Sequence, residues 1–125
     1  MKRILINIVC GIATLFGACA QNEGYETLSA QAFAQKLEET PTIQLLDVRT
    51  ADEYGQGHID KALNLDVKQA NFSAQADSLL DKARPVAVYC RSGVRSQQAA
   101  RQLVQLGFVV YNLKGGYLEW KASQK

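Results

Sequence analysis

The sequence is poor in the residues that build disulfide networks and metal centres. Its 125 residues include three cysteines and a single histidine, His58. Cys10 and Cys19 fall within the first twenty residues, so Cys90 is the one thiol of the remaining chain and has no partner for an internal disulfide. A zinc shell needs three or four protein ligands, and one Cys with one His is too few. We therefore expect no metal and no cofactor.

An excess of charge of either sign is also missing. Lys and Arg number 14 against 12 Asp and Glu, and Lys2 and Arg3 lie in a segment that we expect to be removed. The remaining domain is then neutral and lacks the basic surface that sequence-independent nucleic-acid binding requires.

Long apolar runs are absent as well. The longest one, over 4–16, has 13 residues, and spanning a bilayer takes about 20.

Residues 1–20 are typical of a secretory signal peptide, with two positive charges, a short apolar stretch and small residues after it. Two cleavage patterns overlap. Cleavage after 18–20 (ACA) leaves Gln21 as the first residue, whereas 16–19 (FGAC) resembles a bacterial lipobox in which Cys19 is lipidated. We favour the lipoprotein, with soluble periplasmic release and a retained anchor as alternatives. The domain over 21–125 is thus expected outside the cytoplasm, touching the membrane only through a lipid.

Helix and strand patterns alternate along 21–125. Short apolar runs predict strands, apolar stripes at helical spacing predict helices, and Ser29, Thr50, Pro41 and Gly107 are placed as caps or breaks. Such alternation predicts an α/β domain with a mostly parallel sheet of about five strands and helices on both faces. The strands are expected over 25–28, 42–48, 62–65, 86–89 and 108–111, and the helices over 30–39, 51–54, 72–80, 96–106 and 117–121.

Cys90 stands where the strand 86–89 ends, and open parallel sheets carry their sites beyond the carboxyl ends of strands. Gly93 permits a sharp turn into the next helix, whose first turn Ser92 and Ser96 are expected to cap. The N–H groups of such a loop and the helix dipole favour an anion at this point. We therefore expect a depressed pKa for Cys90 and a nucleophilic thiolate. The alternative is a buried structural cysteine.

Two arginines flank this turn. Arg91 and Arg95 would add two positive charges beside Cys90 and attract an anionic substrate. Phosphatases and arsenate reductases need five residues between Cys and Arg to seat a tetrahedral oxyanion, and here only four intervene. A thiol–disulfide oxidoreductase would need a second cysteine to resolve its mixed disulfide. Both classes are therefore less favoured.

Three segments also follow one another in a familiar order. They are CRSGVRS at 90–96, LLDVRTADEYGQGHIDKALNL at 45–65 and LGFVVYNLKGGYLEW at 106–120. Together they resemble the active-site loop, first motif and C-terminal motif of the rhodanese-like (thiosulfate sulfurtransferase-like) family. The resemblance covers about 25–120 and implies a single rhodanese-like domain.

The resemblance implies sulfur transfer. Cys90 would take the outer sulfur of a small anionic donor such as thiosulfate, hold it as a persulfide, and pass it to a thiol or cyanide. The loop N–H groups would stabilise the persulfide. A non-catalytic sulfur- or protein-binding module is the alternative. The implied substrate-binding residues are Arg91, Ser92, Gly93, Val94, Arg95 and Ser96.

Two further residues match family positions near the loop. Asp47 either supports the loop or only stabilises the fold as a hydrogen-bond acceptor, and both interpretations stay open. His58 lies in a Gly-His-Ile context that is more often structural than catalytic in this family. Arg49 and Glu53 are expected to form a local ion pair that shapes the turn between them.

Overall fold

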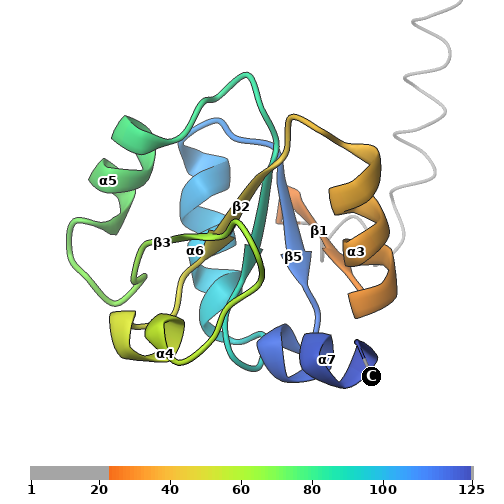
Figure 1. Cartoon of the computed structure of the whole chain (residues 1–125). Helices are drawn as coiled ribbons and strands as arrows, with labels where there is room; N and C mark the ends of the chain where they lie inside the picture. The colour runs from red at the N-terminus through yellow and green to blue at the C-terminus, as the bar shows by residue number, and fades with distance from the viewer. Residues whose placement is uncertain (1–22, 125) are drawn as a thin grey trace, which may run out of the picture.

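The computed structural model describes residues 23–124, whose five strands form one parallel sheet (Figure 1). Its order is β1-β5-β4-β2-β3, and every neighbouring pair runs parallel. The predicted sheet is therefore confirmed. Its strands are β1 (Tyr25–Leu28), β2 (Gln44–Asp47), β3 (Leu63–Asn64), β4 (Val86–Tyr89) and β5 (Val110–Leu113).

Helices cover both faces of the sheet, as predicted (Figure 1). Side chains of α3, α4 and α7 pack with Ala87 and Tyr89 of β4, whereas those of α5 and α6 pack with Val86 and Val88 on the other face. All four β4 residues are fully buried, as expected for the central strand of a covered parallel sheet. The helices are α3 (Ala30–Glu39), α4 (Ala51–Gly55), α5 (Phe72–Leu79), α6 (Arg95–Gln105) and α7 (Gly116–Ser123).

Two helix starts follow directly from the sequence. Ser29 caps α3 by accepting a hydrogen bond from the Ala32 N–H at 3.1 Å. Thr50 and Glu53 form a reciprocal capping box at α4. By contrast, α6 begins after Val94 without a side-chain cap, so the caps expected from Ser92 and Ser96 are not formed. Ser96 lies within the first turn of α6, and its hydroxyl is turned inward toward Cys90.

The last strand lies two residues later than predicted. Phe108 is buried against α6, and its N–H donates to the Leu103 carbonyl at 3.1 Å. Gly107, with φ of +102°, makes this helix-ending turn possible. Residue 108 therefore belongs to the turn that follows α6, and β5 starts at Val110. The final helix is also longer than predicted and begins at Gly116.

The carboxyl ends of the strands lie together with α4, α7 and the loop after β4 at the lower side of Figure 1. Asp47 of β2 is in register with Tyr89 of β4, so Cys90 continues next to the end of β2. No helix within 23–124 is long and apolar enough to cross a membrane. The predicted signal over 1–20, with Cys19, lies outside the described residues.

Candidate active site

Cys90 lies immediately after β4 with its side chain fully buried. The Gly93 N–H donates to the Cys90 Sγ at 3.1 Å, and the buried Ser96 Oγ lies 3.4 Å from the same sulfur. Gly93 adopts a φ of +102°, a conformation that side-chain-bearing residues rarely take. The loop therefore folds back on the sulfur and surrounds it with hydrogen-bonding groups.

The start of α7 binds the backbone of this loop. The Tyr117 N–H donates to the Cys90 carbonyl at 2.8 Å, and the Leu118 N–H donates to the Arg91 carbonyl at 3.1 Å. Gly115 and Gly116 both have positive φ, and the loop backbone packs directly on Gly116. The first N–H groups of α7, which have no partner within their helix, thus satisfy two carbonyls of the cysteine loop.

Arg95 is bound to Glu53 rather than free. Its two terminal nitrogens lie 2.8 and 2.9 Å from the two Glu53 carboxylate oxygens. These hydrogen bonds, together with those from Thr50, lower the pKa of Glu53 to about 2, although burial opposes the shift. The pKa of Arg95 is raised by the same pair. Arg95 therefore fastens the start of α6 to α4, and of the two predicted arginines only Arg91 has no ion-pair partner among residues 23–124.

Arg49 binds Asp47, so the predicted Arg49–Glu53 ion pair is wrong. The Arg49 Nε lies 3.0 Å from the Asp47 Oδ1, and a terminal nitrogen lies 2.6 Å from the Oδ2. Burial lowers the pKa of Arg49, but the Asp47 carboxylate more than offsets this, and the net shift is upward. The guanidinium also lies over the Tyr117 ring, 4.5 Å from its centroid. Asp47 thereby holds the guanidinium that packs on Tyr117 of α7.

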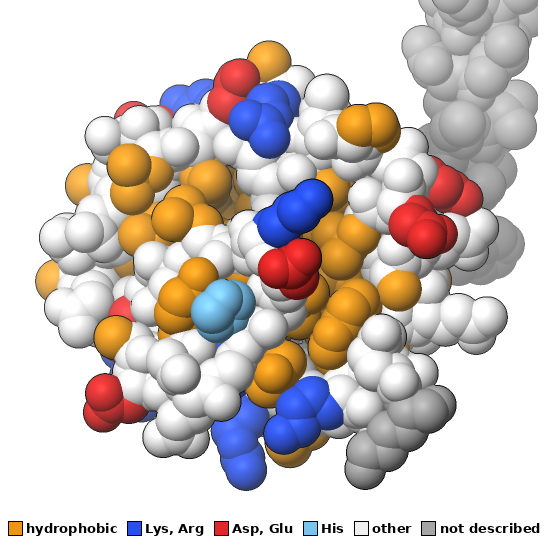
Figure 2. Space-filling view, in the orientation of Figure 1, with side chains coloured by type: hydrophobic (Ala, Val, Ile, Leu, Met, Phe, Trp, Pro, Cys, Tyr) orange, Lys and Arg blue, Asp and Glu red, His pale blue; other side chains and the backbone are white. Residues whose placement is uncertain are grey.

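Arg91 is exposed and lines a cavity of about 240 Å³ between α4 and α7. Lys121 lines it too, and neither cation forms an ion pair among the described residues. Figure 2 shows Lys and Arg side chains at the lower edge of the molecule, in the region of α4 and α7. The arrangement suits a small anion beside the cysteine loop.

His58 is exposed and is held within its own turn. Its ring stacks on Tyr54 at 3.7 Å between centroids, and its Nδ1 lies 2.9 Å from the Tyr54 carbonyl oxygen. These contacts tie the imidazole to the end of α4 and give it a local structural partner. Among the described residues, no group of three His, Cys, Asp or Glu side chains is placed to hold a metal ion.

The model of the family described as "Rhodanese-like domain" matches residues 29–123. The chain belongs to the rhodanese-like family. This match spans every element from α3 to α7 and includes the whole cysteine loop.

Rhodanese-like relatives of similar length include enzymes that are named sulfurtransferases. A thiosulfate sulfurtransferase GlpE of Coxiella burnetii is 43% identical over 91 residues, which cover 71% of this chain and 81% of that protein. The GlpE of Shewanella oneidensis is 39% identical over 98 residues, covering 77% and 92%. A rhodanese-like domain from Anabaena, solved in solution, is 33% identical, covers 78% of this chain and 74% of that one, and has a TM-score of 0.69. This rhodanese-like chain is accordingly an enzyme of the sulfurtransferase type.

Sequence reasoning missed several residues around the loop. Lys121 and Asn112 carry no motif signal of their own, although Asn112 is a polar residue inside the apolar run 108–113. Gly115 and Gly116 enter the sequence analysis only as part of the motif 106–120, whereas the structure packs them on the cysteine loop. Val94, assigned to the substrate-binding loop, has 72% of its surface exposed. Ser92 is exposed as well, while Gly93 and Ser96 contact the thiol.

Proposed function

We propose that the protein moves sulfane sulfur from thiosulfate, or a related anionic donor, to a thiol or cyanide through a persulfide on Cys90. The observation that carries the proposal is the hydrogen bond from the Gly93 N–H to the Cys90 Sγ, in a loop at the end of a central parallel strand. The name of the GlpE relatives supports thiosulfate as a donor.

The reaction has two balanced steps. The Cys90 thiolate attacks the outer sulfur of thiosulfate; a new sulfur–sulfur bond forms, and the old one breaks, with its electron pair leaving on sulfite. An acceptor thiolate or cyanide then attacks the outer sulfur of the persulfide, which releases the Cys90 thiolate. The Gly93 N–H and the Ser96 hydroxyl, both near the sulfur, stabilise the negative charge that each step places there.

Arg91 and Lys121 draw the anionic donor to the loop, because both line the small cavity beside it without an ion-pair partner among residues 23–124. Because the Cys90 side chain is fully buried, the proposed transfer requires its surroundings to open enough for the donor to reach the sulfur. We also propose that this occurs outside the cytoplasm, on the strength of the signal-like residues 1–20.

Oxyanion hydrolysis is less well supported. The Arg95 guanidinium is held by both oxygens of Glu53, so it is not offered to the equatorial oxygens of a phosphate. A non-catalytic binding module would have no need of a cysteine enclosed by hydrogen-bonding groups. We therefore expect no hydrolysis of aryl phosphates by the natural protein, and robust hydrolysis would contradict the proposal.

The decisive experiment is the mass of the purified protein after incubation with thiosulfate. The natural protein should gain one sulfur and lose it again on addition of cyanide, with formation of thiocyanate. Cys90→Ser should gain none and show no measurable turnover, because a hydroxyl cannot carry a persulfide. Cys19→Ser, the control, keeps Cys90 and should gain and lose one sulfur as the natural protein does, whatever its processing. Substantial turnover by a folded Cys90→Ser protein would overturn the assignment.

A further inference from the structure

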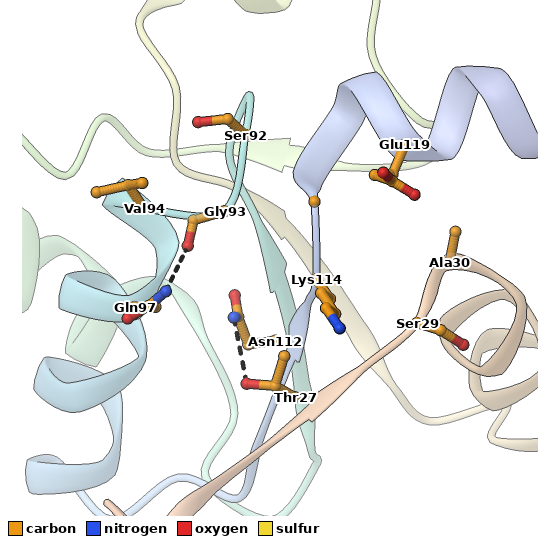
Figure 3. Close-up of a pocket in the computed structure, with 11 residues that line it drawn as sticks. Thr27, Ser29, Ala30, Ser92, Gly93, Val94, Gln97, Asn112, Lys114 and Glu119 are labelled. Atoms are coloured by element: carbon orange, nitrogen blue, oxygen red, sulfur yellow. Dashed lines mark hydrogen bonds between the residues drawn. The ribbon is translucent and has the colours of Figure 1, made fainter.

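A second pocket, of about 540 Å³, lies on the other side of the cysteine loop and contains neither Cys90 nor Arg91 (Figure 3). In Figure 3, Gly93, Val94 and Gln97 stand on one side and Ser29, Ala30 and Glu119 on the other. Between them lie Thr27, Asn112 and Lys114 at the carboxyl ends of β1 and β5. We call this the Asn112 pocket. Its volume falls in the range of small-molecule sites.

The Asn112 side chain points an unused acceptor into this pocket. Only 1% of the residue is exposed, and its Oδ1 is the one buried side-chain polar atom within 23–124 that lacks a hydrogen-bond partner. The Nδ2 lies 3.4 Å from the Thr27 Oγ1, and Figure 3 shows the Oδ1 turned away from Thr27. A buried acceptor without a donor is unfavourable. A ligand that brings an N–H group into the pocket would remove this penalty.

The rim of the pocket carries one charge of each sign. Lys114 and Glu119 are both exposed, and neither forms an ion pair in the part of the chain that the structure describes. The starts of two helices also line the pocket, through Ala30 of α3 and Val94 of α6. Helix N-termini carry partial positive charge and favour a carboxylate. Glu119 in turn favours an ammonium group.

We propose that the Asn112 pocket binds a small zwitterion of the amino-acid or short-peptide type. The ligand's N–H donates to the Asn112 Oδ1, its carboxylate lies near Lys114 and the helix N-termini, and its ammonium group lies near Glu119. A lone anion would leave the Asn112 acceptor unpaired and would be repelled by Glu119. A lone amine would forgo Lys114 and the two helix starts.

The bound zwitterion would touch the loop that encloses the thiol. Gly93 lines the pocket, yet its N–H binds the Cys90 Sγ, and its carbonyl accepts a hydrogen bond from the Gln97 Nε2 at 3.1 Å. Gln97 also lines the pocket. Binding in the Asn112 pocket is therefore expected to change the environment of Gly93, whichever substrate the cysteine uses.

The test uses glycylglycine as the probe, titrated into isotope-labelled protein and followed by NMR and calorimetry. The amide signals of Gly93 and Gly115 should move, whereas that of Gly57, which lines the cavity on the other side of the loop, should not. N-acetylglycine lacks the ammonium group and glycinamide lacks the carboxylate. Each should bind at least about tenfold more weakly than glycylglycine.

Three variants test the ligand's contacts. Asn112→Leu, Lys114→Gln and Glu119→Gln should each weaken glycylglycine binding about fivefold or more, while Lys68→Gln, outside the pocket, should leave it unchanged. Lys114 and Glu119 are exposed, so their variants still measure the ligand contacts if Asn112→Leu disturbs folding. Absence of glycylglycine binding, binding unaffected by Lys114→Gln and Glu119→Gln, or equal binding of N-acetylglycine would overturn the proposal. If glycylglycine does not bind, a water molecule is the partner of the Asn112 Oδ1.

Discussion

Gly116 lies so close to Arg91 that a Cβ atom at Gly116 would come within 2.5 Å of the Arg91 carbonyl carbon and oxygen. The Cys90 carbonyl oxygen would be 2.6 Å away. No side chain fits in this space, so the start of α7 can rest directly on the cysteine loop only because position 116 has none. The same contact brings the Tyr117 and Leu118 N–H groups to the two loop carbonyls.

Gly116→Ala is therefore expected to push α7 away from the loop. The φ of +61° at this position adds backbone strain, and we expect a loss of about 1–3 kcal/mol in the free energy of unfolding, together with reduced sulfur transfer. Gly55→Ala is the matched control, since a Cβ there meets nothing within 4 Å. Urea unfolding and turnover measurements on both variants test the contact. Equal stability of the two variants would show that α7 does not constrain the loop.

The Glu53–Arg95 pair should make stability depend on acid. The pKa of Glu53 is about 2 in the folded protein against 4.5 without its partners, so the folded state binds fewer protons between these values. The stabilisation is complete above pH 4.5 and is lost as the pH falls toward 2. With 27% of the Glu53 side chain and 23% of the Arg95 side chain exposed, we expect the pair to contribute about 1–2 kcal/mol at neutral pH.

Glu53→Gln is the variant that isolates this effect. It should be less stable than the natural protein at neutral pH by that amount, and the difference should shrink as the pH approaches 2, where Glu53 becomes protonated. Urea unfolding at several pH values measures it, with the exposed Glu38→Gln as control. A difference that stays constant from neutral pH to pH 2 would contradict the role of the ion pair.

Arg91 and Arg95 should respond differently to substitution. Arg91→Ala removes an exposed charge, so the KM for thiosulfate should rise about fivefold, with little change for a neutral donor and a smaller effect at high salt. Arg95→Ala breaks the bond to Glu53 and should impair both donors and lower stability. Steady-state kinetics with the two donors separate these cases. Equal losses for both donors in Arg91→Ala would indicate loop collapse instead of lost attraction.

The prediction of lipidation depends on Cys19. If Cys19 is the acylated first residue of the mature protein, the natural chain should sediment with membranes, and Cys19→Ser should block this processing. Cys10→Ser, within the expected leader, should have no effect. Cell fractionation and the mass of the mature N-terminus provide the measurement. A mature protein that begins at Gln21 in the soluble fraction would exclude the lipid anchor while keeping export.

Much of the architecture could be predicted because local patterns determine it. The apolar run 86–89 predicts a buried strand, Ser29 and Thr50 predict helix starts, and Gly93 predicts a sharp turn in the loop after Cys90. These features depend on hydrophobic spacing, helix caps and glycine conformation. Residues that are close together in the sequence determine all three. The position of Cys90 at the end of a central strand follows from them.

The partners of the charged side chains were decided only by the tertiary structure. Arg49 and Glu53 are close enough in sequence to pair, yet Arg49 turns inward to Asp47, and Glu53 receives Arg95 from 42 residues away. The contact of Gly116 with Arg91 and the unpaired Asn112 oxygen likewise arise where β5 and α7 meet the cysteine loop. Such choices depend on which groups the sheet order brings together, because an ion pair or a close approach is a property of three-dimensional distance and not of spacing along the chain.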